Sequence, residues 1–135
     1  NNQNLMIRSI NSSRPWTYIL ELINFVGILS NLFLNNKLNI NFSGLNFSSN
    51  YKNYKIGDLL IILNKKIDLK WKSQKNLILE DKFLDINSSY IRNMINYKNV
   101  FNFNESLNQM IDWYAQFYNE KNILTKSHEQ LNKIQ

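Results

Sequence analysis

Apolar residues recur at helical spacing over several stretches of this chain. The longest predicted helix starts at Thr17 or a neighbour and runs to about Leu34. A helix that is apolar all round is usually buried on several sides, so we expect other elements to cover this one. Asn35 and Asn36 can end it, because Asn tolerates the left-handed conformation. The apolar residues that nearly encircle it are Leu20, Ile23, Phe25, Val26, Ile28, Leu29, Leu32 and Phe33.

Further helices are predicted from periodicity and from capping residues. Asn104 is expected to cap the last long helix, with Glu105 in the first turn, where the helix dipole favours an acid. The chain turns polar after Glu120, and we expect this tail to fray. The other helices are predicted at Lys55–Leu63 and from the capping cluster Asn87-Ser88-Ser89 to Met94 or Ile95.

Short runs of alternating or continuous apolar residues predict strands between these helices. A chain of 135 residues allows one domain with a modest core. Mixed helices and strands without internal repeats indicate an α/β fold with too few elements for a complete doubly wound domain. The predicted strands are Leu5–Ile7, Leu38–Phe42, Ile67–Lys72 and Leu77–Leu79.

Composition excludes several kinds of site. The chain has no cysteine, so disulfides and thiolate metal sites are not available. The acidic residues between Asp68 and Asp85 have no neighbouring His, so we expect no metal site. The three glycines are Gly27, Gly44 and Gly57, which is too few for a Gly-rich phosphate loop.

The net charge of +6 at first suggests an anionic partner. The basic residues are scattered, however, so we expect only weak, nonspecific binding of nucleic acid. A basic nucleic-acid-binding module and a non-catalytic interaction protein remain the alternatives. Glu21, Asn24 and Asn31 interrupt the longest apolar run, which makes it too polar to span a membrane comfortably. We therefore expect a cytoplasmic protein without membrane contact.

The segment Arg14-Pro15-Trp16 joins the first predicted strand to the longest helix. Pro15 fixes its own φ and favours an extended backbone at Arg14. Guanidinium offers a rigid fork of donors, so an extended Arg14 could clamp a phosphate. The alternative is a surface arginine whose stem covers Trp16.

Tyr51 and Lys55 have the Tyr-x-x-x-Lys spacing that short-chain dehydrogenases use as an acid/base pair. This spacing arises easily by chance in a chain rich in Tyr and Lys. We therefore assign no catalytic residue.

The order of the motifs resembles the C-terminal part of the CDP-glucose 4,6-dehydratases, within the extended short-chain dehydrogenase/reductase enzymes (NAD-dependent epimerase/dehydratase family). The resemblance covers about residues 1–120 and leaves residues 121–135 as a polar tail. The segments that carry it are residues 1–8, Arg14-Pro15-Trp16 with Ile19-Leu20-Glu21, Asn41-Phe42, Phe83-Leu84-Asp85, and Leu107 with Met110-Ile111-Asp112-Trp113-Tyr114.

The resemblance implies a role in a lyase reaction that converts CDP-glucose to a CDP-4-keto-6-deoxyglucose. In that family a Rossmann half binds NAD and carries the catalytic residues, and the C-terminal lobe holds the nucleotide sugar. The implied substrate-binding residues are Arg14, on the diphosphate, and Asn41, on the nucleotide portion. NAD would be bound by a Rossmann half of the same or a companion chain, because this sequence lacks that half.

Overall fold

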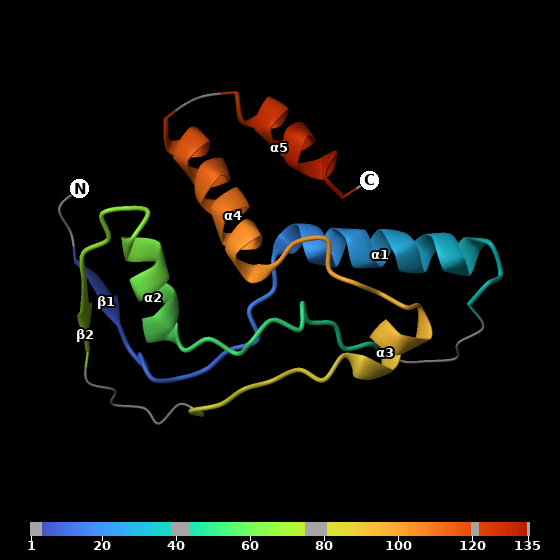
Figure 1. Ribbon diagram of the computed structural model, residues 1–135, viewed down its shortest axis with the longest axis horizontal. Coiled ribbons are helices and arrows are strands. Elements are labelled where there is room, and N and C mark those ends of the chain that lie inside the picture. Colours follow the sequence, from blue (N-terminus) through green and yellow to red (C-terminus); the bar gives the residue numbers. More distant parts are fainter. Residues whose placement is uncertain (1–3, 39–43, 75–80, 120–121, 135) are drawn as a thin grey trace. The chain divides into compact units, whose positions relative to one another are not determined.

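The computed structural model describes residues 4–38, 44–74, 81–119 and 122–134 (Figure 1). The chain forms two compact units. The smaller unit consists of Asn1–Trp16 and Lys52–Ile86, and the larger unit consists of Thr17–Tyr51 and Asn87–Gln135. Helices combine with a two-stranded parallel sheet, which confirms the expected α/β class in its small form.

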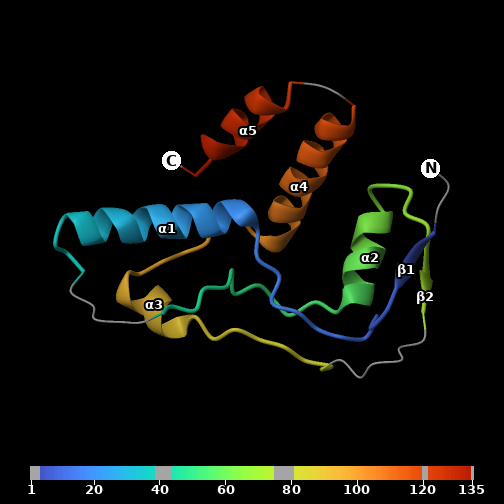
Figure 2. The same cartoon turned by 180° about the vertical axis from the view of Figure 1, so that it is seen from behind.

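The smaller unit pairs strand β1 (Leu5–Ile7) in parallel with strand β2 (Trp71–Ser73). Helix α2 (Ile56–Asn64) lies beside this ribbon (Figure 2). The Gly57 amide donates to the Ile10 carbonyl at 2.9 Å. A Cβ at Gly57 would lie only 3.0 Å from Ile10 Cγ1, so glycine lets the start of α2 lie against this segment.

The prediction for α2 is confirmed. The strand predicted after it is wrong at its N-terminal end. The strand expected at Ile67–Lys72 begins only at Trp71. The Ile67 amide still donates to the Leu63 carbonyl at 3.0 Å. The Leu69 amide donates to the Asn64 side chain at 3.0 Å, which holds the chain in a turn after α2. The strands expected at Leu38–Phe42 and Leu77–Leu79 fall on residues 39–43 and 75–80, outside the described residues.

The larger unit contains four helices in its described residues. The predicted bounds of α1 and α3 are confirmed, and Asn36 after α1 adopts a φ of 53°, as expected for Asn at a helix end. The Asn87 side chain accepts the Ser89 amide at 3.0 Å where α3 begins. The helices are α1 (Ile19–Leu34), α3 (Ser89–Met94), α4 (Phe103–Tyr118) and α5 (Ile123–Leu131).

Helix α4 is capped two residues before the predicted position. Asn102, not Asn104, is the N-cap: its side chain accepts the Glu105 amide at 3.0 Å, while the Glu105 carboxylate accepts the Asn102 amide at 2.8 Å. This reciprocal pair needs the acid three residues after the cap. Asn104 directly precedes Glu105 and therefore cannot form it.

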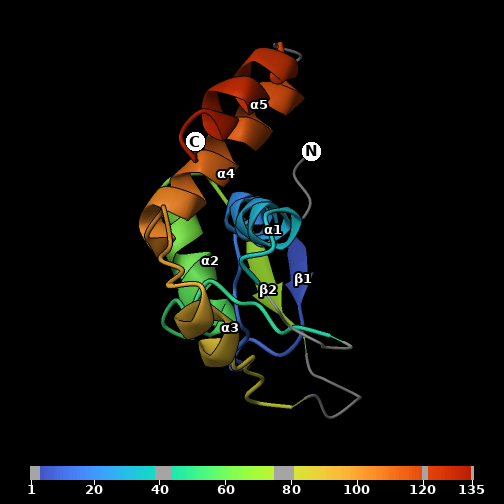
Figure 3. The same cartoon turned by 90° about the vertical axis from the view of Figure 1, so that its right-hand side faces the viewer.

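The tail after Glu120 was expected to fray, and the structure corrects this expectation. Helix α5 begins there, and the Asn122 side chain accepts the Thr125 amide at 3.3 Å as its cap. Helices α4 and α5 pack against each other (Figure 3). The Trp113 indole on α4 donates to Ser127 Oγ on α5 at 2.9 Å. This contact holds α5 against α4, and the polar composition of the tail does not predict it.

The larger unit has two apolar clusters. One contains Tyr18, Leu20 and Phe101, with Met110 and Leu131 packed against it. The other contains three buried side chains and the ring of Phe47, which stacks on Phe25 at a centroid distance of 4.1 Å. The three buried residues of the second cluster are Phe25, Ile91 and Tyr97. Together the clusters join α1 to the segments before and within α3 and α4.

Glu21 lies between these clusters, in the first turn of α1, and is fully buried. One carboxylate oxygen accepts the Phe101 amide at 2.7 Å, and the other accepts the Tyr97 hydroxyl at 2.7 Å. Burial, and then the contact with Glu21, raise the pKa of Tyr97 above its ordinary value. A buried charge is costly unless hydrogen bonds satisfy it, so these two donors hold the 97–101 segment on α1.

Helix α1 is not buried on several sides, contrary to the expectation from its composition. Only Leu20, Glu21 and Phe25 are buried. The opposite side exposes large apolar residues, because the larger unit supplies packing partners for one face of the helix only. The exposed apolar residues are Ile19, Leu22, Ile23, Val26, Phe33 and Leu34.

We expect Tyr97→Phe to lower the free energy of unfolding by about 1.5–3 kcal/mol, because the buried Glu21 carboxylate loses a hydrogen-bond donor. Urea denaturation of the full chain measures this. Tyr90→Phe is the matched control, since Tyr90 is 67% exposed. Equal stability of the two variants would contradict the structural role of Glu21.

Candidate functional site

Arg14 lies in the smaller unit, half-buried, at the end of a short extended segment. The neighbouring Ser13 amide donates to the Lys82 carbonyl at 2.8 Å, and the Ser13 carbonyl accepts the Leu84 amide at 3.2 Å. Ser13 also forms an antiparallel bridge with Lys55. The Arg14 backbone is therefore anchored between the start of α2 and the 82–84 segment.

The Arg14 guanidinium is held by main-chain acceptors. Its Nη1 donates to the Ser13 carbonyl at 2.8 Å and to the Asp81 carbonyl at 3.0 Å. These bonds fix the plane of the fork before any ligand arrives. A fork that is fixed in advance loses less freedom when it binds an oxyanion.

Trp16 has an anchor of its own in the same unit. Its indole Nε1 donates to the Tyr54 carbonyl at 2.9 Å, and its ring is half-buried. Neither Arg14 nor Trp16 therefore depends on the other for its hydrogen bonds.

Asn41, the second residue implied by the resemblance, lies outside the described residues. The structure therefore places Arg14 alone of the two predicted substrate-binding residues. Residues beside Arg14 are identified by its contacts: Ser13 and Asp81 supply the carbonyls that orient it. The sequence does not indicate the role of these two carbonyls, because every residue has a main-chain carbonyl, whatever its side chain.

Tyr51 has structural partners in the larger unit. Its hydroxyl lies 2.6 Å from Ser106 Oγ and donates to the Phe101 carbonyl at 3.2 Å. Burial raises the pKa of Tyr51, which disfavours the phenolate that an acid/base tyrosine must form. Lys55 belongs to the smaller unit, where its amide donates to the Asp58 carboxylate at 3.2 Å. These contacts favour a structural role for Tyr51.

Arg92 is a second half-buried arginine that sequence reasoning missed. Its guanidinium donates to the Ser48 carbonyl at 3.1 Å and to Asn99 Oδ1 at 2.8 Å. The guanidinium carbon also lies 4.9 Å from the centroid of the Tyr97 ring, within range of a cation–π contact. Arg92 therefore fastens the 48–49 segment to the end of α3.

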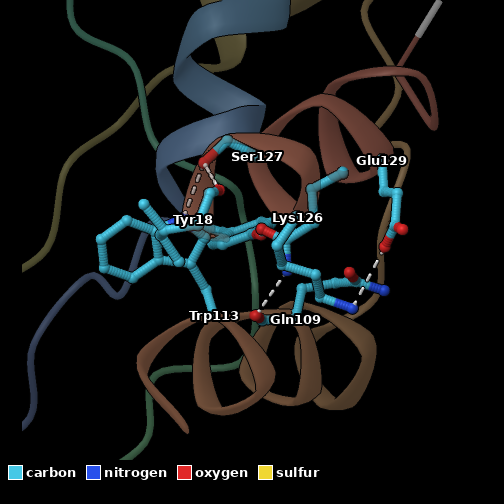
Figure 4. Close-up of polar contacts among 8 residues, drawn as sticks. Tyr18, Gln109, Trp113, Lys126, Ser127 and Glu129 are labelled. Atoms are coloured by element: carbon cyan, nitrogen blue, oxygen red, sulfur yellow. Dashed lines mark hydrogen bonds and ion pairs between the residues drawn. The ribbon is translucent and has the colours of Figure 1, made fainter. Parts of the chain in front are cut away.

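A polar network joins α1 to α4 and α5 in the larger unit (Figure 4). The Tyr18 hydroxyl donates to Gln130 Oε1 at 3.3 Å, and Gln130 Nε2 donates to the Gln109 carbonyl at 2.7 Å. Gln130 is only 4% exposed, although it lies in a segment of polar composition. Burial, and then the nearby Tyr51, raise the pKa of Tyr18 to about 12.

Two further observations limit the possible sites among the residues that the structure describes. There, no three residues of His, Cys, Asp or Glu gather as a metal site would require, and His128 is exposed on α5. No helix in the same ranges has the length and apolar character needed to cross a membrane.

No protein-family profile, curated protein or solved structure matches this chain.

The raised pKa of Tyr18 predicts a loss of stability in alkali. Below about pH 10 both the folded and the unfolded chain keep the proton, so this tyrosine adds no pH dependence. Above pH 10 the unfolded chain loses it first, and stability falls as the pH approaches 12. Urea denaturation at pH 9 and at pH 11 measures the free energy of unfolding. Between these two pH values it should fall less for Tyr18→Phe than for the unaltered chain. Tyr114→Phe is the control, because Tyr114 is exposed. If the free energy of unfolding falls equally in both variants, burial of Tyr18 is not the cause of the alkaline loss of stability.

Proposed function

We propose that this chain is the nucleotide-sugar-binding lobe of an NAD-dependent lyase similar to the CDP-glucose 4,6-dehydratases. In this proposal Arg14 binds the diphosphate and Asn41 the nucleotide portion. The chemistry needs NAD and the catalytic residues of a Rossmann half, on the same or a companion chain. The lobe alone binds the nucleotide sugar and does not convert it.

The observation that carries the proposal is the orientation of Arg14. Two main-chain carbonyls, of Ser13 and Asp81, hold one nitrogen of the guanidinium. Arg-to-phosphate pairing depends on such a planar fork, and a lysine cannot reproduce it. The half-buried site also lowers the local dielectric, which strengthens a contact with a diphosphate.

Two of the segments behind the resemblance contain residues with structural roles. Glu21, in the Arg-Pro-Trp…Leu-Glu segment, is buried and doubly hydrogen-bonded. Trp113, in the closing helix, joins α4 to α5 through Ser127. The structural roles of Glu21 and Trp113, one in each segment, support the proposal.

We expect the isolated chain to bind CDP-glucose, and Arg14→Ala to weaken binding by about ten- to a hundredfold. The charge-assisted contact is worth roughly 1.5–3 kcal/mol, and each 1.4 kcal/mol is a factor of ten. Arg14→Lys should recover only part of the affinity. Isothermal titration calorimetry measures all three chains.

Arg8→Ala is the matched control, because Arg8 is an exposed arginine in the same unit. It removes the same charge and should leave the affinity nearly unchanged. An equal loss from both variants would mean that only the overall charge matters. Submicromolar, sequence-selective binding of DNA or RNA at physiological salt would instead favour the nucleic-acid-binding alternative.

A further inference from the structure

The fold gathers most of the positive charge in the smaller unit, although the basic residues are scattered along the sequence. That unit holds 10 of the 16 lysines and arginines and 5 of the 10 acidic residues. Its net charge is therefore +5, and the larger unit carries the remaining +1. Such an excess of one sign attracts an anion before any specific contact forms. The candidate site at Arg14 lies in this basic unit.

Lys82 adjoins the backbone that orients the Arg14 guanidinium. Arg14 Nη1 donates to the Asp81 carbonyl at 3.0 Å, and this carbonyl belongs to the peptide bond between Asp81 and Lys82. The Lys82 carbonyl in turn accepts the Ser13 amide at 2.8 Å. Contacts with the carbonyls on both sides of the Lys82 Cα therefore hold this residue beside the Arg14 fork.

The pairing of the two segments assigns the side chains of Arg14 and Lys82 to one face. Ser13 and Phe83 form a parallel bridge, so their side chains lie on the same side of the pair. Successive residues of an extended segment point to opposite sides, so Arg14 and Lys82 both belong to the other side. Residues that are diagonal neighbours on one face are within reach of each other when their side chains are long.

The two cations differ in exposure and in freedom. Arg14 is half-buried and its fork is fixed, whereas Lys82 is exposed. The ammonium of a lysine is a point charge with three donors on a flexible stem, so it can adjust to a phosphate whose position is set by another group. A diphosphate bound at the Arg14 fork presents such a group, because its two phosphoryl groups share one bridging oxygen.

We propose that Lys82 binds the second phosphoryl group of a diphosphate whose first phosphoryl group is held by Arg14. The pair then selects diphosphates over monophosphates, because only a diphosphate offers a separate phosphoryl group to each cation. This inference rests on the proposed nucleotide-sugar binding and identifies the residue that selects the diphosphate.

Isothermal titration calorimetry of the full chain with CDP and with CMP tests the role of Lys82, since the two ligands differ by one phosphoryl group. Lys82→Ala should weaken the binding of CDP about fivefold, the size expected for a favourable exposed ion pair. The binding of CMP should stay nearly unchanged. Lys82→Arg should keep most of the affinity for CDP, because it retains a positive charge at this position.

Lys72→Ala is the matched control, because Lys72 is another exposed lysine of the smaller unit. It removes the same charge and should leave the affinity for both ligands nearly unchanged. Lys82→Ala should fold like the unaltered chain, since Arg14 and Ser13 contact only main-chain atoms at positions 81 and 82, and alanine retains these atoms.

Equal loss of CDP affinity in Lys82→Ala and Lys72→Ala would overturn the inference, because overall charge would then explain it. An unchanged CDP affinity in Lys82→Ala, or an equal loss for CDP and CMP, would also overturn it, while the proposed function stands. Arg14→Ala tests that function in the same titrations, since it should weaken the binding of both ligands. If the unaltered chain binds neither ligand, or if Arg14→Ala binds both as tightly as the unaltered chain, the proposed function fails and the role of Lys82 fails with it.

Discussion

The buried carboxylate of Glu21 is the constraint on which the larger unit depends. Removing a carboxylate from water costs several kcal/mol unless hydrogen bonds replace the solvent. The Phe101 amide and the Tyr97 hydroxyl are those replacements. Both donors come from the segment between α3 and α4, so their position relative to α1 is set by this one side chain. The aromatic contacts of Tyr97 with Phe25 and Arg92 are arranged around the same point.

This constraint also explains why α1 has two different faces. Glu21, together with Leu20 and Phe25, fixes which side of the helix faces the core. The remaining apolar residues then point away from it, although their composition alone suggests burial. The helix thus supplies the core with one face and leaves the opposite face exposed. Arg14 in the smaller unit is held in a similar way. Main-chain carbonyls accept hydrogen bonds from its guanidinium and fix its orientation.

The sequence predicted the helices that depend on interactions between residues close together in the chain. The bounds of α1, α2 and α3 follow from apolar spacing and from asparagine and serine at the helix ends. The cap of α4 was misplaced by two residues because Asn102 and Asn104 both precede Glu105, and only the spacing of three allows the reciprocal bonds. The burial of Glu21 and Gln130 could not be predicted, because their partners lie 76 or more residues away and 21 or more residues away, respectively. The sequence pointed to Arg14 through its neighbour Pro15, but the carbonyls that orient it became visible only in the folded chain.

Binding of a nucleotide sugar at Arg14 can be observed by two-dimensional NMR of the labelled full chain, titrated with CDP-glucose. We expect chemical-shift changes in the amides around Ser13 and Trp16, in the 81–84 segment and in the Arg14 side chain. These changes should disappear in Arg14→Ala. Unchanged spectra at millimolar CDP-glucose, or changes that persist in Arg14→Ala, would contradict it.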